Sequence, residues 1–201
     1  LYLRFNPRLN VDFNEGNIQL AQVKPLIRIP AIKFDFSPRQ LSISDSRVII
    51  GESDFKLTGE ATNIRKYIKG QDLLKGQFDF VSEKTNINQL MDLVSGFGNN
   101  DSTTVTETAT TTPAEAEANP FMVPKGIDVT LHTVIKNAVF NDNLLQNVGG
   151  QLTIKDGVAV LEQMGFTCDA AKMQLTAIYR SERRNHLFAG INFHLLNIDI
   201  K

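Results

Sequence analysis

The side chains that could do chemistry are few and scattered. The three histidines are His132, His186 and His194, and the only cysteine is Cys168. His132 and His194 fall at polar positions of alternating segments, where a solvated imidazole is expected, because a metal site needs several clustered ligands. Cys168 cannot form an intramolecular disulfide, and we interpret it as a small buried hydrophobic residue. The sequence therefore predicts no metal site.

Motifs of enzymes and of nucleotide-binding proteins are missing from the sequence. The chain contains no Gly-x-Ser-x-Gly, no P-loop and no His-Glu-x-x-His pattern. Gly96-Phe97-Gly98 precedes a polar segment instead of opening a helix, so it does not form a phosphate cradle. A hydrolase would need a nucleophile or a cluster of carboxylates, and neither is recognisable. We predict a protein that is not an enzyme and uses no cofactor.

One cluster of basic residues could contact a ligand. Arg180, Arg183 and Arg184, with Glu182 among them, have the composition of a hairpin tip. Basic side chains on such a tip are ordinarily solvated, and contact with a lipid headgroup is the alternative role.

The composition predicts a folded protein without a nucleic-acid partner. Apolar residues make up 42% of the 201 residues and charged residues 21%, which is enough for one large β domain or two small ones. The formal net charge is −1, and this balance provides no electrostatic footprint for nucleic acid or for an anionic membrane surface. Thirteen phenylalanines and no tryptophan suit strands that bury one face.

Alternation of apolar and polar residues is the dominant pattern of the chain. It is clearest over residues 127–135, 172–180 and 187–195, and this period of two predicts half-buried strands. Asp156-Gly157 lies between two such segments and favours a two-residue hairpin turn. Closing that hairpin pairs Ile154 with Ala159 and Leu152 with Leu161 on one face.

Helical periodicity is confined to two short segments. Residues 86–95 place Ile87, Leu90, Met91 and Val94 at helical spacing, after Asn86 and Gln89 in the arrangement of a capping box. A weaker turn of helix is predicted over residues 64–68. Both segments are so short that packing on a sheet must stabilise them.

Residues 98–120 divide the chain into two β units. This segment is polar and of low complexity, so we interpret it as a mobile loop, with a binding lid as the alternative. The first unit, residues 1–97, and the second, residues 121–201, contain matching segments: 40–46 and 151–157, 55–58 and 173–176, 78–80 and 191–193. We predict a mainly β fold, a curled and twisted antiparallel sheet built from repeated β units, with one or two short helices packed on it.

Simple alternation makes one predicted strand apolar on both faces. It places Val158, Val160, Met164, Phe166 and Cys168 on one face, and Ala159 and Leu161 on the other. Such a strand must be covered on both sides or must line a cavity or groove. Either the helix near residues 86–94 covers the sheet, or the strands line a groove that holds acyl chains.

Four residues are candidate contacts for a lipid: Met164, Phe166, Ile191 and Phe193. Alternation places Met164 and Phe166 on one face and Ile191 and Phe193 on another. Both pairs can therefore contact one ligand only if the strands bend or bulge between them.

Residues 147–200 carry a resemblance to a known family. They contain Gly150-Gln151-Leu152-Thr153-Ile154-Lys155-Asp156-Gly157, then a strand over residues 172–179, then a closing Leu195-Leu196-Asn197-Ile198-Asp199-Ile200. This succession resembles the C-terminal region of the AsmA family, with its G-x-L-x-I/L-x-D-G hairpin and closing L-x-L-x-x-V-D-I strand. Residues 73–80 resemble the family's L-K-G-x-F-x-L strand, whereas Ala170-Ala171 and Ala177 stand where glycine is common in it.

The resemblance implies a place and a role in the bacterial cell envelope. It implies a long protein with a periplasmic body, anchored in the inner membrane through a segment outside this chain, and both ends of the chain have the pattern of strands, as expected of a piece of such a protein. It implies a function in outer-membrane assembly, through binding or conducting phospholipid or another lipid along an apolar β groove. Outer-membrane assembly components are further expected partners. The alternative is a structural scaffold that assists outer-membrane protein assembly without binding lipid.

A periplasmic location would also allow one residue to be modified. Asp101-Ser102-Thr103 resembles an O-glycosylation site that some bacteria use in the periplasm, with Ser102 as the acceptor.

Overall fold

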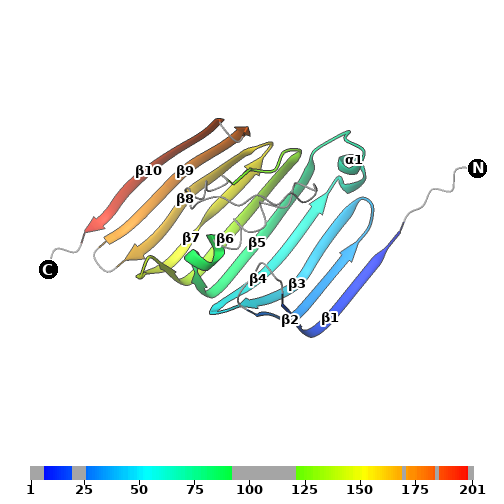
Figure 1. Cartoon of the computed structure of the whole chain (residues 1–201), viewed down its shortest axis with the longest axis horizontal. Coiled ribbons are helices and arrows are strands. Elements are labelled where there is room, and N and C mark those ends of the chain that lie inside the picture. Colours follow the sequence, from blue (N-terminus) through cyan, green and yellow to red (C-terminus); the bar gives the residue numbers. More distant parts are fainter. Residues whose placement is uncertain (1–6, 20–25, 92–120, 169–170, 184–185, 199–201) are drawn as a thin grey trace, which may run out of the picture.

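The fold is a single open, twisted sheet of ten strands, in which the order of the strands in space follows their order in the sequence (Figure 1). The computed structural model describes residues 7–19, 26–91, 121–168, 171–183 and 186–198. The strands are β1 (Leu9–Ile18), β2 (Ile27–Phe36), β3 (Gln40–Ile50), β4 (Ser53–Thr62), β5 (Leu74–Asn86), β6 (Ile127–Phe140), β7 (Asn143–Lys155), β8 (Val158–Cys168), β9 (Ala171–Arg183) and β10 (His186–Ile198). The mainly β class is confirmed.

The sheet is mixed, because one central pair of strands is parallel. All neighbouring strands pair antiparallel except β5 and β6. A parallel pair needs a crossover connection, and residues 87–126 provide it. The predicted loop 98–120, with Ser102, belongs to this connection and lies outside the described residues.

The segments that match between the two halves do not correspond strand by strand. They lie in β3, β4 and β5 of the first half, and in β7, β9 and β10 of the second. β8 therefore has no counterpart between β3 and β4. Each half contributes five strands to the same sheet.

The hairpin predicted at Asp156-Gly157 is present between β7 and β8. Both turn residues have positive φ, 44° and 85°, as a type I′ turn requires. Ile154 pairs with Ala159 and Leu152 with Leu161, which confirms the predicted register.

The two short helices are also present. The first is α1 (Ile64–Ile68), and the second begins at residue 87 and is helical to residue 91, where this described segment ends. The Gln89 backbone N–H donates to Asn86 Oδ1 (3.3 Å), so Asn86 caps the second helix as predicted. The reciprocal half of the capping box is not formed, because the Asn86 N–H donates to Ser53 Oγ instead (2.9 Å) and leaves Gln89 Oε1 buried without a partner.

One face of the sheet is apolar across all ten strands. Directly paired residues project on the same side of a sheet, so the register assigns each side chain to a face. One row contains a single residue from each strand, in order: Val11, Phe34, Ile43, Gly59, Phe78, Leu131, Leu152, Leu161, Ala177 and Ile191. We call this side the apolar face.

The opposite side, which we call the polar face, has a different composition. Its neighbouring row reads Asn10, Asp35, Ser42, Glu60, Gln77, Thr130, Thr153, Val160, Ile178 and Gly190. Over the first seven strands this row is polar. Lys33 and Asp12 form an ion pair on this face (3.1 Å), as do Lys155 and Asp128 (3.1 Å). Such exposed pairs contribute about 0–1 kcal/mol each, so the apolar face supplies most of the driving force for folding.

Candidate functional site: the apolar face of the sheet

A bulge in β8 decides which side chains share the apolar face. Gln163 has a positive φ of 48°, and the register with β9 shifts between Leu161 and Met164. Because one extra residue reverses the alternation, Leu161 and Met164 project on the same side. The prediction from simple alternation is therefore wrong. The residues of β8 on the apolar face are Ala159, Leu161, Met164, Phe166 and Cys168, opposite Tyr179, Ala177, Leu175, Met173 and Ala171 of β9.

The same bulge brings the four candidate lipid contacts onto one face. Met164 and Phe193 both pair with Leu175, and Ile191 pairs with Ala177. Phe166 pairs with Met173 on that side. The assignment of the two candidate pairs to different faces is thus corrected, and the bulge that a common contact surface needed is present.

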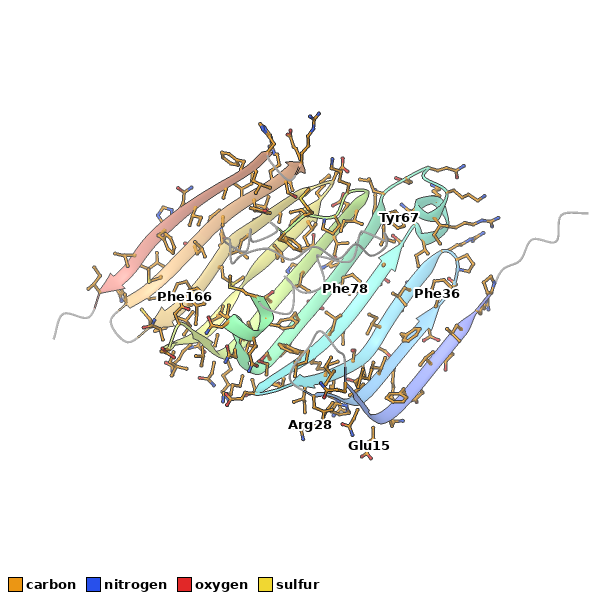
Figure 2. All side chains as sticks on the ribbon, in the orientation of Figure 1. Glu15, Arg28, Phe36, Tyr67, Phe78 and Phe166 are labelled. Atoms are coloured by element: carbon orange, nitrogen blue, oxygen red, sulfur yellow. The ribbon has the colours of Figure 1, made fainter. Side chains whose placement is uncertain are left out.

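The four candidates differ in how accessible they are. Met164 and Phe166 are half-buried and pack against the buried cluster of Ile135, Ala138 and Val148. Ile191 and Phe193 are 60% and 59% exposed. β8 therefore contributes to the core, whereas β10 presents an open apolar surface. Phe36, Phe78 and Phe166 mark the same face on β2, β5 and β8 (Figure 2).

The described parts of the crossover connection cover the apolar face at two places. Ile87, at the start of the second helix, packs on the central buried cluster. Val123 is 3% exposed, and its N–H donates to Ser181 Oγ (2.7 Å), while the Tyr179 hydroxyl donates to the Phe121 carbonyl (2.8 Å).

Most of the large apolar side chains left exposed on this face lie on the two outermost described strands. They are Leu9, Phe13 and Ile18 on β1, and Leu187, Ile191, Phe193, Leu195 and Ile198 on β10. We call the β10 group the terminal apolar patch.

Side chains of the types that can ligate a metal do not cluster in the part of the chain that the structure describes. There, no group of three or more His, Cys, Asp or Glu side chains could hold a metal ion. His132 lies on the polar face, and its Nε2 is 3.2 Å from the Gln77 side-chain nitrogen. His194 lies opposite Gln174 on the same face. Within the same residues, no helix is long and apolar enough to cross a membrane.

Cys168 and the arginine cluster have ordinary surroundings. Cys168 is half-buried on the apolar face, with its Sγ 3.4 Å from the Ala171 carbonyl oxygen. The Arg180 Nη1 atom lies 3.9 Å from Glu182 Oε1 near the end of β9. The hairpin tip itself, residues 184–185 with Arg184, is outside the described ranges.

A signal for the bulge was present in the sequence. Glu162 and Gln163 are two successive polar residues inside an apolar strand, which interrupts the period of two. Glycines occupy the neighbouring positions: Gly149 pairs with Gly165, and a Cβ on Gly150 would lie 2.8 Å from the Met164 Cα. Glycine inside a strand commonly accompanies a bulge or a close backbone approach.

A comparison of the chain with protein-family models, with curated proteins and with solved structures finds no match.

Proposed function

We propose that this chain is a periplasmic section of an AsmA-like protein, anchored in the inner membrane through a segment outside residues 1–201, which binds phospholipid by its acyl chains. The single observation that supports this best is the row of apolar residues that crosses all ten strands. The family likeness rests on residues 73–80 and 147–200. In this proposal the chain contributes to outer-membrane assembly and carries out no catalytic step.

The dimensions of the sheet suit a ligand that lies across the strands. Adjacent strands are about 4.8 Å apart, so ten strands extend over roughly 43 Å. Burial of one acyl chain contributes about 0.8 kcal/mol for each CH₂, on the order of 10 kcal/mol in total before the cost of ordering the chain. Apolar contact alone is sufficient for stable binding.

The charge distribution predicts how the ligand is selected. No residue of the apolar row is charged. The next row of paired residues on this face is also uncharged; it begins with Leu9 on β1 and Phe36 on β2 and ends with Tyr179 on β9 and Ala189 on β10. A headgroup therefore stays at the margin of the sheet, in water. The protein therefore selects its lipid ligand by the acyl chain and not by the headgroup.

We therefore expect binding that depends little on the headgroup or on salt. The delipidated chain would be titrated with phosphatidylethanolamine, phosphatidylglycerol and phosphatidic acid of the same acyl composition, at low and high ionic strength. The dissociation constants should agree within about threefold, since headgroup contacts contribute little. A preference of tenfold or more for the anionic lipids that fades with salt would contradict acyl-chain selection and would assign recognition to basic side chains such as Arg180.

A structural scaffold for outer-membrane protein assembly is the second candidate. The observation that favours it is the open sheet, whose edge strands β1 and β10 each have a neighbour on one side only among the described strands. A scaffold would bind protein at these edges and would retain no lipid, and the same titration separates the two functions.

A further inference from the structure

Two connections between strands meet at one end of the sheet, around α1. They are the turn between β2 and β3, residues 37–39, and residues 63–75, which join β4 to β5 and include the first two residues of β5. The Arg65 backbone N–H donates to the Pro38 carbonyl (2.8 Å) and so ties one connection to the other. Figure 1 shows α1 beyond the end of β4. We call residues 37–39 and 63–75 the basic tip; both connections are internal to the sheet, so the tip keeps its composition whatever pairs with β1 or β10.

The basic tip concentrates positive charge that the net charge of the chain conceals. Of the 21 basic and 22 acidic residues in the chain, five and one belong to the tip, so the remaining residues carry a net charge of −5. All five basic residues are exposed: Arg39, Arg65, Lys66, Lys69 and Lys75. Among the described residues only Lys66 has an acidic partner, Asp72, with Nζ and Oδ2 3.6 Å apart. The prediction of no electrostatic footprint for an anionic membrane surface rested on the net charge of −1, and it does not hold at this tip.

Exposed apolar side chains lie among these charges. Ile68 is 75% exposed, the largest value for any large apolar side chain that the structure describes, and Tyr67 beside it is 39% exposed (Figure 2). Ile64 is buried, so α1 is held on the sheet by one side and presents Tyr67 and Ile68 on another. Aromatic and aliphatic side chains surrounded by lysine and arginine are typical of protein segments at a bilayer interface. There the apolar groups enter the acyl region while the basic groups stay with the phosphates.

We propose that the basic tip docks on the surface of a bilayer that contains anionic phospholipid, with Ile68 inserted below the headgroups. The four basic side chains without an acidic partner can each approach a different headgroup. An acidic protein would match the charge but would need a pocket for Ile68, whereas a bilayer provides apolar surroundings wherever the tip meets it. One lipid molecule brings one headgroup and cannot engage basic residues on two connections. Docking therefore leaves the binding of individual lipids on the apolar face independent of their headgroups.

Co-sedimentation of the intact chain with vesicles tests the role of charge. Vesicles of equal parts phosphatidylglycerol and phosphatidylcholine should bind the chain more tightly than vesicles of phosphatidylcholine alone, and added salt should remove the difference by screening exposed charges. Arg65→Gln combined with Lys69→Gln should weaken binding to the anionic vesicles at least about tenfold. Lys56→Gln combined with Lys172→Gln is the matched control, because both lysines are exposed and lie on β4 and β9, outside the tip. Its affinity should stay within about twofold of the wild type, and equal losses in the two double variants would overturn the proposal.

Fluorescence tests whether α1 enters the bilayer. The chain contains no tryptophan, so Ile68→Trp introduces a single reporter. Its emission should shift to shorter wavelength on the anionic vesicles and should be quenched by brominated acyl chains. Leu144→Trp is the control at the opposite end of the sheet, where Leu144 is 44% exposed on β7, and it should show neither effect.

Three further results would overturn the proposal. Equal shifts for Ile68→Trp and Leu144→Trp would indicate non-specific adsorption. An Ile68→Trp emission that responds to soluble polyglutamate and not to vesicles would assign the tip to an acidic protein. Phe193→Asp changes only the apolar face and should leave the preference for anionic vesicles within about twofold of the wild type. Loss of that preference would show that the apolar face, and not the tip, recognises the vesicles, so docking and lipid binding can fail separately. Far-ultraviolet circular dichroism confirms that each variant is folded.

Discussion

Phe193→Asp should strongly weaken phospholipid binding and leave the chain folded. Phe193 is 59% exposed on β10, so replacing its ring removes little packing from the protein itself. A bound acyl chain would cover this position, and burying an unpaired carboxylate costs several kcal/mol. We expect affinity to fall at least about a hundredfold, which corresponds to roughly 2.8 kcal/mol. The measurement is the titration of delipidated wild-type and variant chains with the same phospholipid.

The control for this prediction is the next residue along the strand. His194→Asp introduces the same side chain on the polar face, opposite Gln174, and should leave the affinity within about twofold of the wild type. If Phe193→Asp folds and binds lipid as tightly as His194→Asp does, the terminal apolar patch is not the lipid site. The scaffold function would then be the better account.

Phe166→Asp should unfold the chain or bring it close to unfolding. Phe166 packs against the buried cluster of Ile135, Ala138 and Val148, so the substitution removes a packed ring and places a carboxylate beside apolar side chains. Loss of the ring alone costs about 3–5 kcal/mol, and the buried charge adds to that. A decrease of at least about 4 kcal/mol is a large part of a total stability of 5–15 kcal/mol. Urea unfolding followed by circular dichroism measures it.

The neighbouring position provides the matched control here too. Thr167 lies on the polar face, opposite Lys172, so Thr167→Asp should change the free energy of unfolding by no more than about 0.5 kcal/mol. Equal and small losses for both variants would show that Phe166 is not part of a packed core.

The fold could be predicted from the sequence wherever a strand alternates without interruption. Residues 127–135 and 172–180 alternate with few exceptions, such as Val134 and Ile178, and their faces are the predicted ones. The turn at Asp156-Gly157 fixed the register of its hairpin because two positive φ angles are needed there. The parallel pairing of β5 with β6 could not be predicted, since local pattern does not specify the direction of a partner strand that lies across a long connection.

The site could be predicted less completely, for two physical reasons. The period of two propagates along a strand, so a single bulged residue reverses every assignment beyond it. Gln163 is that residue in β8, and the interruption placed Met164 and Phe166 on the wrong face in the sequence-based assignment. Accessibility could not be predicted either. Met164 and Phe193 share a face, yet only Met164 packs on the central cluster, because that cluster forms where Ile87 returns onto the sheet.

Native mass spectrometry tests the central claim most directly. The wild-type chain would be directed to the bacterial periplasm, extracted without lipid-stripping detergent, and weighed intact together with anything bound to it. We predict phospholipid adducts whose headgroups follow the composition of the surrounding membrane, because the apolar row carries no charge with which to select among them. A chain that is folded and free of lipid, or that is associated only with protein, would contradict the account.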